Sequence, residues 1–401
     1  MKRPRFDQLL TMMVVFWTIA HAMPARSEQS PAKAPSEPAA DANQPSPPAA
    51  PEGTRRGQTG RAGNTQANER TISGSLRWLF DHQNADGSWR FDPPADAENA
   101  YANPGAWKSD SGATALALLP FFAAGQTQKT IGPYRATIAS ALQSLIKQQK
   151  PNGDLSGGGS PKMLSHGLAA VTLCEAYGLS GDKTVGAAAQ QAINFIVASQ
   201  NENTGGWAEP SGQPAMSVSA WQLMALTSGS LAGLEVPAPA LKKAAKFLDS
   251  LQAKDGAKYG ESKARGASDA ATIMGLLAGR YLGSRPAGVK EDAGEDSGVK
   301  WLSERGLFEN DAISNVWATI FMHKHPGDDW NAWNRNMRKQ LIATQIREGD
   351  ESGSWWNPRD VHAPEGGRLF QTAMNALTLE VYYRYLPLFK PLPKDIAPAN
   401  Q

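Results

Sequence analysis

Apolar residues recur at helical spacing along most of the chain. In TISGSLRWLFDHQNADGSW, the residues Ile72, Leu76, Leu79 and Phe80 fall at i, i+4, i+7 and i+8, which is one face of an amphipathic helix. The pattern stops at a glycine, Gly87, and glycine can take the left-handed conformation that ends a helix. The sequence therefore predicts a half-exposed helix followed by a turn.

Four further helical segments end in a similar turn. They read ALQSLIKQQKPNGDL, AINFIVASQNENTGGW, AAKFLDSLQAKDGAKY and QLIATQIREGDESGSW. Each places a glutamine before a glycine-containing loop, where the amide can bond backbone groups freed at the helix end and an indole can cover that amide. A sixth segment, SGVKWLSERG, lacks the loop motif. We interpret the motif as structural, repeated because the fold repeats.

A second kind of helix is predicted after each of these segments. These helices are apolar or small on nearly every face, which is typical of a helix that is buried all round. They fall in the stretches that begin at Ser109, Leu164, Met216, Ala267, Ile313 and Leu369. Their alignment places the following residues at equivalent positions: Ser111, His166, Val218, Asp269, Asn315 and Gln371.

Six helical hairpins of this kind can close into a ring, with the second helix of each hairpin lining the middle. The alternative is an open solenoid, which usually needs polar capping repeats at its ends. The last buried helix ends in VYYRYLPLF and is as apolar and aromatic as the first. The sequence therefore predicts an all-α fold, an (α/α)6 toroid, over residues 71–390.

The two ends of the chain have a different character. Residues 1–22 begin with Lys2, Arg3 and Arg5, continue with an apolar run and close on AHA, a pattern that predicts a secretory signal peptide. The run is shorter than the roughly 20 residues of a membrane-spanning helix, although an uncleaved segment would give membrane association. Residues 23–70, rich in Pro and Ala, are predicted to be a disordered tether, and 391–401 a disordered tail. We expect export, to the periplasm or the extracellular space.

Composition narrows the choice of partners. The net charge is +2 and no basic run is interleaved with aromatics, so nucleic acid is not expected as a partner. The single cysteine, Cys174, excludes intrachain disulfides and cysteine-cluster metal sites. His323 and His325 could hold a metal with Asp328 and Asp329, but a helix end followed by a helix cap explains these residues better. We expect no metal and no cofactor.

The helix pairs and their Gln…Gly-Ser-Trp loops resemble the repeats of the squalene and terpene cyclases and of the protein prenyltransferase beta subunits. The resemblance covers Ile72 to Phe389. It implies an alpha/alpha toroid with a central cavity for an isoprenoid. The prenyltransferases hold zinc with an Asp, a Cys and a His, but Cys174, in VTLCEAYG, has no Asp two residues before it. We expect Cys174 to be a small buried core residue.

The acid motif of the cyclases is missing. Those enzymes carry Asp-x-Asp-Asp at the start of an inner helix, and its acid protonates an alkene. The comparable places here hold single aspartates, Asp110 in SDSGAT and Asp269 in ASDAAT. Two interpretations stay open: the aspartates cap their helices, or they act as a catalytic acid or ligand contact. Whether the protein is an enzyme also stays open.

His166 begins the second inner helix, where an imidazole could act as acid or base near neutral pH. A hydrogen-bonded structural histidine is the alternative. All inner helices should begin at one end of the ring, so we expect His166, Ser111, Asp269 and Gln371 to meet at one mouth, with Asp110 beside them. The summed helix dipoles there would suit a carboxylate or phosphate.

Trp221 and Trp317 occupy early positions of two inner helices. They could line the cavity, where ring faces would stabilise cationic intermediates of a polyprenyl chain or stack on a sugar. Packing in the core is the alternative interpretation. With Ser111 and Gln371 they are the candidate ligand contacts.

Three functions remain from the sequence. The first is an exported toroid that binds, and in one form of the hypothesis processes, an apolar isoprenoid-type small molecule in its central cavity without the usual acid motif. The second is a non-catalytic binding or scaffold toroid that holds a protein or peptide at the ring mouth. The third is a polysaccharide hydrolase or lyase, which paired carboxylates at glycosidase spacing would support.

Overall fold

The fold is seen in a computed structural model that describes residues 66–253, 258–282, 293–383 and 386–389. The chain divides into two units, Met1–Ser46 and Pro47–Gln401, and every described residue belongs to the second. The predicted signal peptide (1–22), most of the predicted tether (23–70) and the predicted tail (391–401) lie outside the described residues. The first described helix begins at Gln66, five residues before the predicted start of the toroid.

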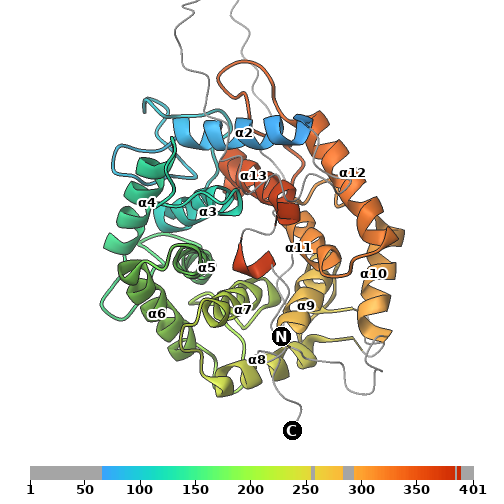
Figure 1. The fold of residues 1–401 in the computed structure, drawn as a ribbon. Coiled ribbons are helices and arrows are strands. Elements are labelled where there is room, and N and C mark those ends of the chain that lie inside the picture. The colour runs from blue at the N-terminus through green and yellow to red at the C-terminus, as the bar shows by residue number, and fades with distance from the viewer. Residues whose placement is uncertain (1–65, 254–257, 283–292, 384–385, 390–401) are drawn as a thin grey trace, which may run out of the picture. The chain divides into compact units, whose positions relative to one another are not determined.

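The described residues contain twelve α-helices, which alternate between an outer and an inner layer (Figure 1). The outer helices are α2 (Gln66–Asp81), α4 (Arg135–Lys147), α6 (Lys183–Ala198), α8 (Ala238–Leu251), α10 (Ala293–Arg305) and α12 (Asp328–Thr344). The inner helices are α3 (Asp110–Ala123), α5 (Lys162–Ser180), α7 (Met216–Leu231), α9 (Asp269–Leu282), α11 (Ala312–His323) and α13 (Ala363–Glu380). Inner helices are buried on nearly every face, as their composition predicts.

The six hairpins close into a ring. Each inner helix packs on the next, and α13 packs on α3, while the last outer helix, α12, contacts the first described one, α2. The junction is also fixed by side chains: Glu351 accepts a hydrogen bond from Trp78 Nε1 (3.0 Å), and Arg368 Nε donates to the Ala102 carbonyl (2.8 Å). The predicted all-α (α/α)6 toroid is confirmed.

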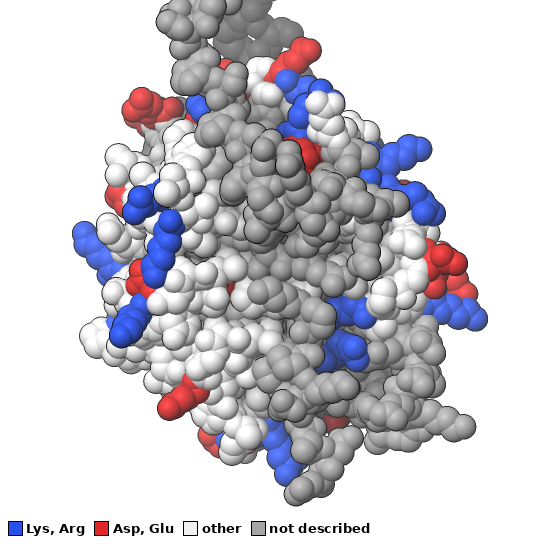
Figure 2. Space-filling view, viewed as in Figure 1, with Lys and Arg blue, Asp and Glu red and all other residues white. Residues whose placement is uncertain are grey.

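Short elements complete the described fold. A hairpin of β1 (Gly260–Ser262) and β2 (Arg265–Ala267) precedes α9, and two 3-10 turns, η1 (Val381–Tyr383) and η2 (Pro387–Phe389), follow α13. Within the described ranges, none of the helices has the length and apolar character needed to cross a bilayer. Figure 2 shows lysine and arginine interspersed with aspartate and glutamate, in keeping with the net charge of +2.

The repeated glutamines join neighbouring outer helices. Gln83 Nε2 donates both to the carbonyl of Gly87 in its own loop and to the carbonyl of Thr137 in the next outer helix, each at 2.9 Å. The other three fully described copies do the same: Gln149 with Gly153 and Ala188, Gln200 with Gly205 and Ala240, and Gln345 with Gly353 and Thr71. The last of these links α12 to α2 and closes the outer layer.

The loop glycine makes the second contact of this joint. Gly87 has a φ of +83°, and a Cβ there would stand 2.6 Å from the Ser140 carbonyl oxygen. Ser140 lies three residues beyond Thr137, the residue that accepts from the glutamine. The same three-residue offset relates the other contacts, of Gly153 with Gln191, Gly205 with Lys243, and Gly353 with Gly74. The glutamine and the glycine of each of these four loops therefore contact the same turn of the next outer helix.

The tryptophan of the motif binds the helix that precedes it. Trp89 Nε1 donates to the Leu79 carbonyl at 2.8 Å, near the end of α2. Trp207 and Trp355 bond the Ile196 and Leu341 carbonyls in the same way. The indole therefore adds a hydrogen bond to a carbonyl near the end of the preceding outer helix.

Neighbouring glutamines test the joint. Gln149→Met removes two hydrogen bonds and leaves the Gly153 carbonyl without its partner, so we expect the free energy of unfolding to fall by about 2–4 kcal/mol. Gln148 donates only to Ser144 in its own helix, and Gln148→Met should cost less than about 1 kcal/mol. Urea denaturation of the two variants measures the difference. Equal losses of stability in the two variants would show that the amide contact between hairpins stabilises the fold no more than the bond of Gln148 within its own helix.

Candidate functional site

A polar side chain near the start of each inner helix, or in α13 shortly after its kink at Gly367, binds the preceding loop. Trp89 N donates to Thr114 Oγ1 (3.0 Å), and Trp207 N donates to Ser219 Oγ (2.9 Å). The residues that accept in this way are Thr114, His166, Ser219, Thr272, Asn315 and Thr372. These positions are equivalent in the structure, so the sequence alignment is correct at His166 and Asn315. It is wrong by one to three residues at Ser111, Val218, Asp269 and Gln371.

His166 is completely buried, at 0% exposure. Its Nδ1 accepts from Leu155 N at 3.0 Å, and Nε2 donates to the Ala192 carbonyl at 3.2 Å. Burial lowers the pKa of the imidazole to about 4, although Ala192 and Asp154 act in the opposite direction. Both nitrogens of a neutral ring are engaged within the protein, which favours the structural interpretation over an acid or base at the mouth.

Asp110 begins α3 but does not cap it. The cap is Ser109, whose Oγ accepts from Gly112 N at 3.1 Å. The Asp110 carboxylate lies 3.3 Å from Arg90 Nη2 and is partly exposed. Partial burial raises its pKa, while Arg90 works against that rise. The capping hypothesis for Asp110 is wrong by one residue.

Asp269 repeats this arrangement at the start of α9. Ser268 Oγ accepts from Ala271 N at 3.2 Å and so takes the capping role. Asp269 instead accepts from Arg305 Nε at 2.8 Å, and about half of its side chain is exposed. The capping hypothesis is therefore wrong here as well, because a serine precedes the aspartate in both hairpins.

Ser111 and Gln371 are also used inside the protein. Ser111 is buried, with its Oγ 3.4 Å from Ser109 Oγ. Gln371 holds the backbone of Asn357, accepting from its N–H at 2.7 Å and donating to its carbonyl at 3.0 Å. Neither side chain is presented to a ligand at the mouth in this arrangement.

Carboxylates of the protein itself occupy three of the inner-helix N-termini. Glu209 accepts from two backbone N–H groups at the start of α5, Glu261 from one at the start of α7, and Asp360 from one at the start of α11. Each comes from the loop of the following hairpin. The expectation that these dipoles await a carboxylate or phosphate ligand is therefore wrong for α5, α7 and α11.

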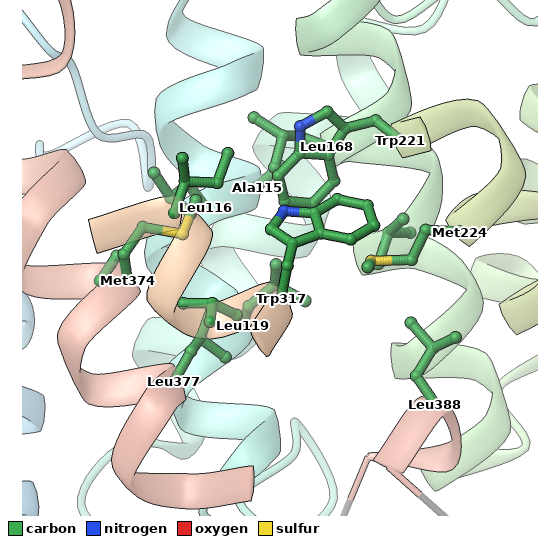
Figure 3. Close-up of a cluster of buried hydrophobic side chains, with 14 of the residues drawn as sticks. Ala115, Leu116, Leu119, Leu168, Trp221, Met224, Trp317, Met374, Leu377 and Leu388 are labelled. Atoms are coloured by element: carbon green, nitrogen blue, oxygen red, sulfur yellow. The ribbon is translucent and has the colours of Figure 1, made fainter. Parts of the chain in front are cut away.

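Trp221 and Trp317 meet in the middle of the ring (Figure 3). Their ring centroids are 5.3 Å apart with the planes 80° to each other, and their exposures are 3% and 1%. The side chains around them come from α3, α5, α7, α13 and η2: Ala115, Leu116, Leu119, Leu168, Met224, Met374, Leu377 and Leu388. The described centre of the ring is thus an apolar cluster with two indoles at its heart.

The turn η2 packs against α5 and α7 beside this cluster. The Leu388 carbonyl accepts from Tyr281 Oη and from Lys324 Nζ, each at 3.1 Å, while the Leu388 side chain points into the cluster. Burial, and then the charge of Glu175, raises the pKa of the Tyr281 hydroxyl. The phenol therefore stays protonated and able to donate.

The fold also buries two carboxylates that are not among the predicted site residues. Glu175 is 0% exposed and Glu380 is 1% exposed, and Glu175 accepts from Ser228 Oγ. Glu175 stood out only as the acidic residue in the otherwise apolar LCEAYG. Its neighbours come from other hairpins, so the sequence could not show what the carboxylate would meet.

Solved structures with a similar fold support this description. They include the type II terpene cyclase MstE from Scytonema (TM-score 0.51, 16% identity, 80% of this chain and 100% of that one). Cellobiose 2-epimerase from Bacillus thermoamylovorans (0.56, 13%, 79% and 99%) and an inactive variant of the alpha-1,6-mannanase GH76A of a Salegentibacter species (0.53, 10%, 81% and 100%) are also similar. The chain is an alpha/alpha toroid. At these identities the likeness concerns the fold alone.

Comparison of the sequence with known proteins does not assign the chain to a family. No protein-family model matches the toroid's sequence, and no curated protein matches it either. Since toroids serve unrelated chemistries, the function has to be argued from the residues themselves.

The acidic and cysteine side chains that were considered as metal ligands have other roles in the structure. Within the described ranges no group of three or more His, Cys, Asp or Glu side chains could hold an ion. Asp328 and Asp329 lie in the first turn of α12, whose cap position is Gly327, so their predicted capping role is wrong. Asp329 accepts from Ser303 Oγ at 2.7 Å. Cys174 is a buried core thiol, as predicted.

The buried His166 gives stability a defined pH dependence. The unfolded chain protonates this imidazole below about pH 6.5, whereas the toroid does so only near pH 4. Stability is therefore lost as the pH falls through this window, by up to about 3 kcal/mol. His166→Gln can still accept from Leu155 and donate to Ala192 but cannot titrate.

Urea denaturation at pH 7 and pH 4.5 measures this effect. Carboxylates elsewhere titrate equally in both proteins, so we expect the variant to lose less stability than the parent between these values. Parallel losses would mean that His166 does not carry the effect.

Proposed function

We propose that this toroid binds an apolar, isoprenoid-type small molecule in the centre of the ring. The observation that carries the proposal is the Trp221–Trp317 pair, set among leucine and methionine side chains of the inner helices. Aromatic and aliphatic side chains with few polar groups are the usual lining of a site for an apolar ligand.

The composition of the centre favours an isoprenoid over a sugar. A sugar presents hydroxyls that need hydrogen-bond partners, and hydrolysis needs two carboxyl groups flanking the bond. The described side chains around Trp221 and Trp317 are aliphatic or thioether groups instead. The MstE variant in complex with geranylgeranyl dihydroxybenzoate, its substrate, shows one toroid of similar fold that takes an isoprenoid chain.

The described acids support binding more than proton-driven cyclisation. Asp110 and Asp269 are paired with Arg90 and Arg305 and lie at partly exposed helix starts. Each carboxylate is already bound by an arginine of this chain, so neither is held ready for an apolar substrate. We therefore propose a binding function that needs no catalytic step.

Access and location are part of the proposal. The turn η2 packs against α5 and α7, so a ligand arriving from that side must displace the Leu388 turn held by Tyr281 and Lys324. Export to the periplasm or extracellular space rests on the sequence of residues 1–22 alone. A small molecule held during transport or storage outside the cytoplasm would fit both features.

Thermal unfolding of the full chain with lipid probes tests the function. Geranylgeraniol should raise the melting temperature in a dose-dependent manner, since a ligand at 100 times its Kd stabilises by about 2.7 kcal/mol. Trp221→Leu should weaken this binding at least about tenfold. Trp301→Leu on outer helix α10 should leave it unchanged.

Oligosaccharides, added in the same thermal-unfolding experiment, test the carbohydrate hypothesis. Stabilisation by manno- or cello-oligosaccharides, with none by isoprenoids, would replace the proposal by the carbohydrate hypothesis. A protein that responds to neither class would point to the scaffold hypothesis, with a protein or peptide partner at the ring mouth.

A further inference from the structure

The two central indoles differ from the other tryptophans in one respect. Their Nε1 atoms are buried and have no hydrogen-bond partner among the described residues. Five other indoles donate to an oxygen at 2.8 to 3.0 Å: Trp78, Trp89, Trp207, Trp333 and Trp355. The fold thus satisfies indole N–H groups elsewhere and leaves two donors open at the point where the inner helices meet.

Unpaired buried donors are uncommon in native proteins because they lose their hydrogen bond to water and gain none in return. The edge-to-face contact of Trp221 with Trp317 does not remove this cost. An N–H that faces an aromatic ring recovers only part of a hydrogen bond. Phenylalanine would fill much of the same space without the cost, so the two donors call for an acceptor that the described chain does not supply.

We infer that Trp221 and Trp317 recognise a neutral carbonyl-type oxygen on an otherwise apolar ligand. In the view of Figure 3 both indole nitrogens lie on the same side of the pair. A carbonyl oxygen has two lone pairs and no hydrogen of its own, so it matches two donors. The inference rests on the proposed binding function and specifies the ligand as a ketone, aldehyde, ester or quinone.

The surroundings of the pair favour a carbonyl over other oxygen-containing groups. The described neighbours are leucine, methionine and alanine, so an ionised carboxylate or diphosphate would be buried without a counter-ion. An alcohol brings its own O–H donor, and indoles offer no acceptor for it. A water molecule would find only the two donors, while buried water typically makes about three hydrogen bonds.

One other unpaired group lies nearby in sequence. Gln222 Oε1 is buried without a partner, but the Gln222 amide is held by a bond from Nε2 to the Met163 carbonyl at 2.8 Å and packs close to Gly167. It therefore belongs to the interface between α5 and α7. The two indoles are the donors that remain at the centre.

A matched set of ligands tests the inference. Geranylgeranylacetone carries one ketone, and its reduced counterparts are the secondary alcohol and the hydrocarbon in which a methylene replaces the carbonyl. Binding to the full chain is followed by calorimetry and by tryptophan fluorescence. We expect the ketone to bind about tenfold to a hundredfold more tightly than the hydrocarbon, as one or two hydrogen bonds would give, with the alcohol between them.

Two variants assign the preference to the indoles. Trp221→Phe and Trp317→Phe keep an aromatic ring and lose the N–H, so each should reduce the preference for the ketone while the hydrocarbon binds about as before. Trp301→Phe, on the outer surface, should keep the full preference. Far-ultraviolet circular dichroism checks that each variant is folded. If a variant does not fold, the comparison of ketone with hydrocarbon on the unaltered protein still decides.

The outcomes separate the two proposals. Equal binding of ketone and hydrocarbon, or an undiminished preference in both phenylalanine variants, would overturn the carbonyl inference and leave apolar binding intact. Failure of all three ligands to bind would overturn the proposed function and the inference with it.

Discussion

The joint between one glutamine and the next outer helix is the interaction on which the rest of the ring depends. In the joint between α2 and α4, the Gln83 amide spans two carbonyls and Gly87 lies against a third, so the contact fixes both distance and rotation. The same contacts recur in the three other fully described joints. The copy at Gln345 reaches Thr71 in α2, and the ring closes.

The residues at the starts of the inner helices are used to hold the ring together, which limits where a functional site can lie. The starts of the inner helices are the places where related folds are expected to keep their chemistry, yet here they carry out structural tasks. Thr114, His166 and Ser219 bind the loops, and Glu209 and Glu261 cap the neighbouring helices. The open hydrogen-bonding capacity described above lies instead at the centre, on two indoles. This distribution is what makes a binding function more consistent with the structure than acid catalysis.

Several features could be predicted from residues alone, and the reasons are local. Helical periodicity and the Gln…Gly-Trp loops were enough for six hairpins, and the small apolar inner helices were enough for a buried layer. It was harder to predict which positions of the inner helices are equivalent to one another. Between the motif tryptophan and its acceptor lie 25 positions for Trp89 and Thr114 but 12 for Trp207 and Ser219, so an alignment by helix start misplaced Ser111 and Asp269.

The sequence by itself determined the hairpins, their order and the alternation of half-exposed with buried helices, because these follow from periodicity and from residues that end a helix. Only the tertiary structure decided which groups meet across hairpins. Serines, and not Asp110 or Asp269, became the caps, and His166 became neutral and enclosed. Trp221 and Trp317, 96 positions apart, came into contact with no acceptor beside them. Burial and hydrogen-bond partners depend on contacts between distant segments, which no local pattern encodes.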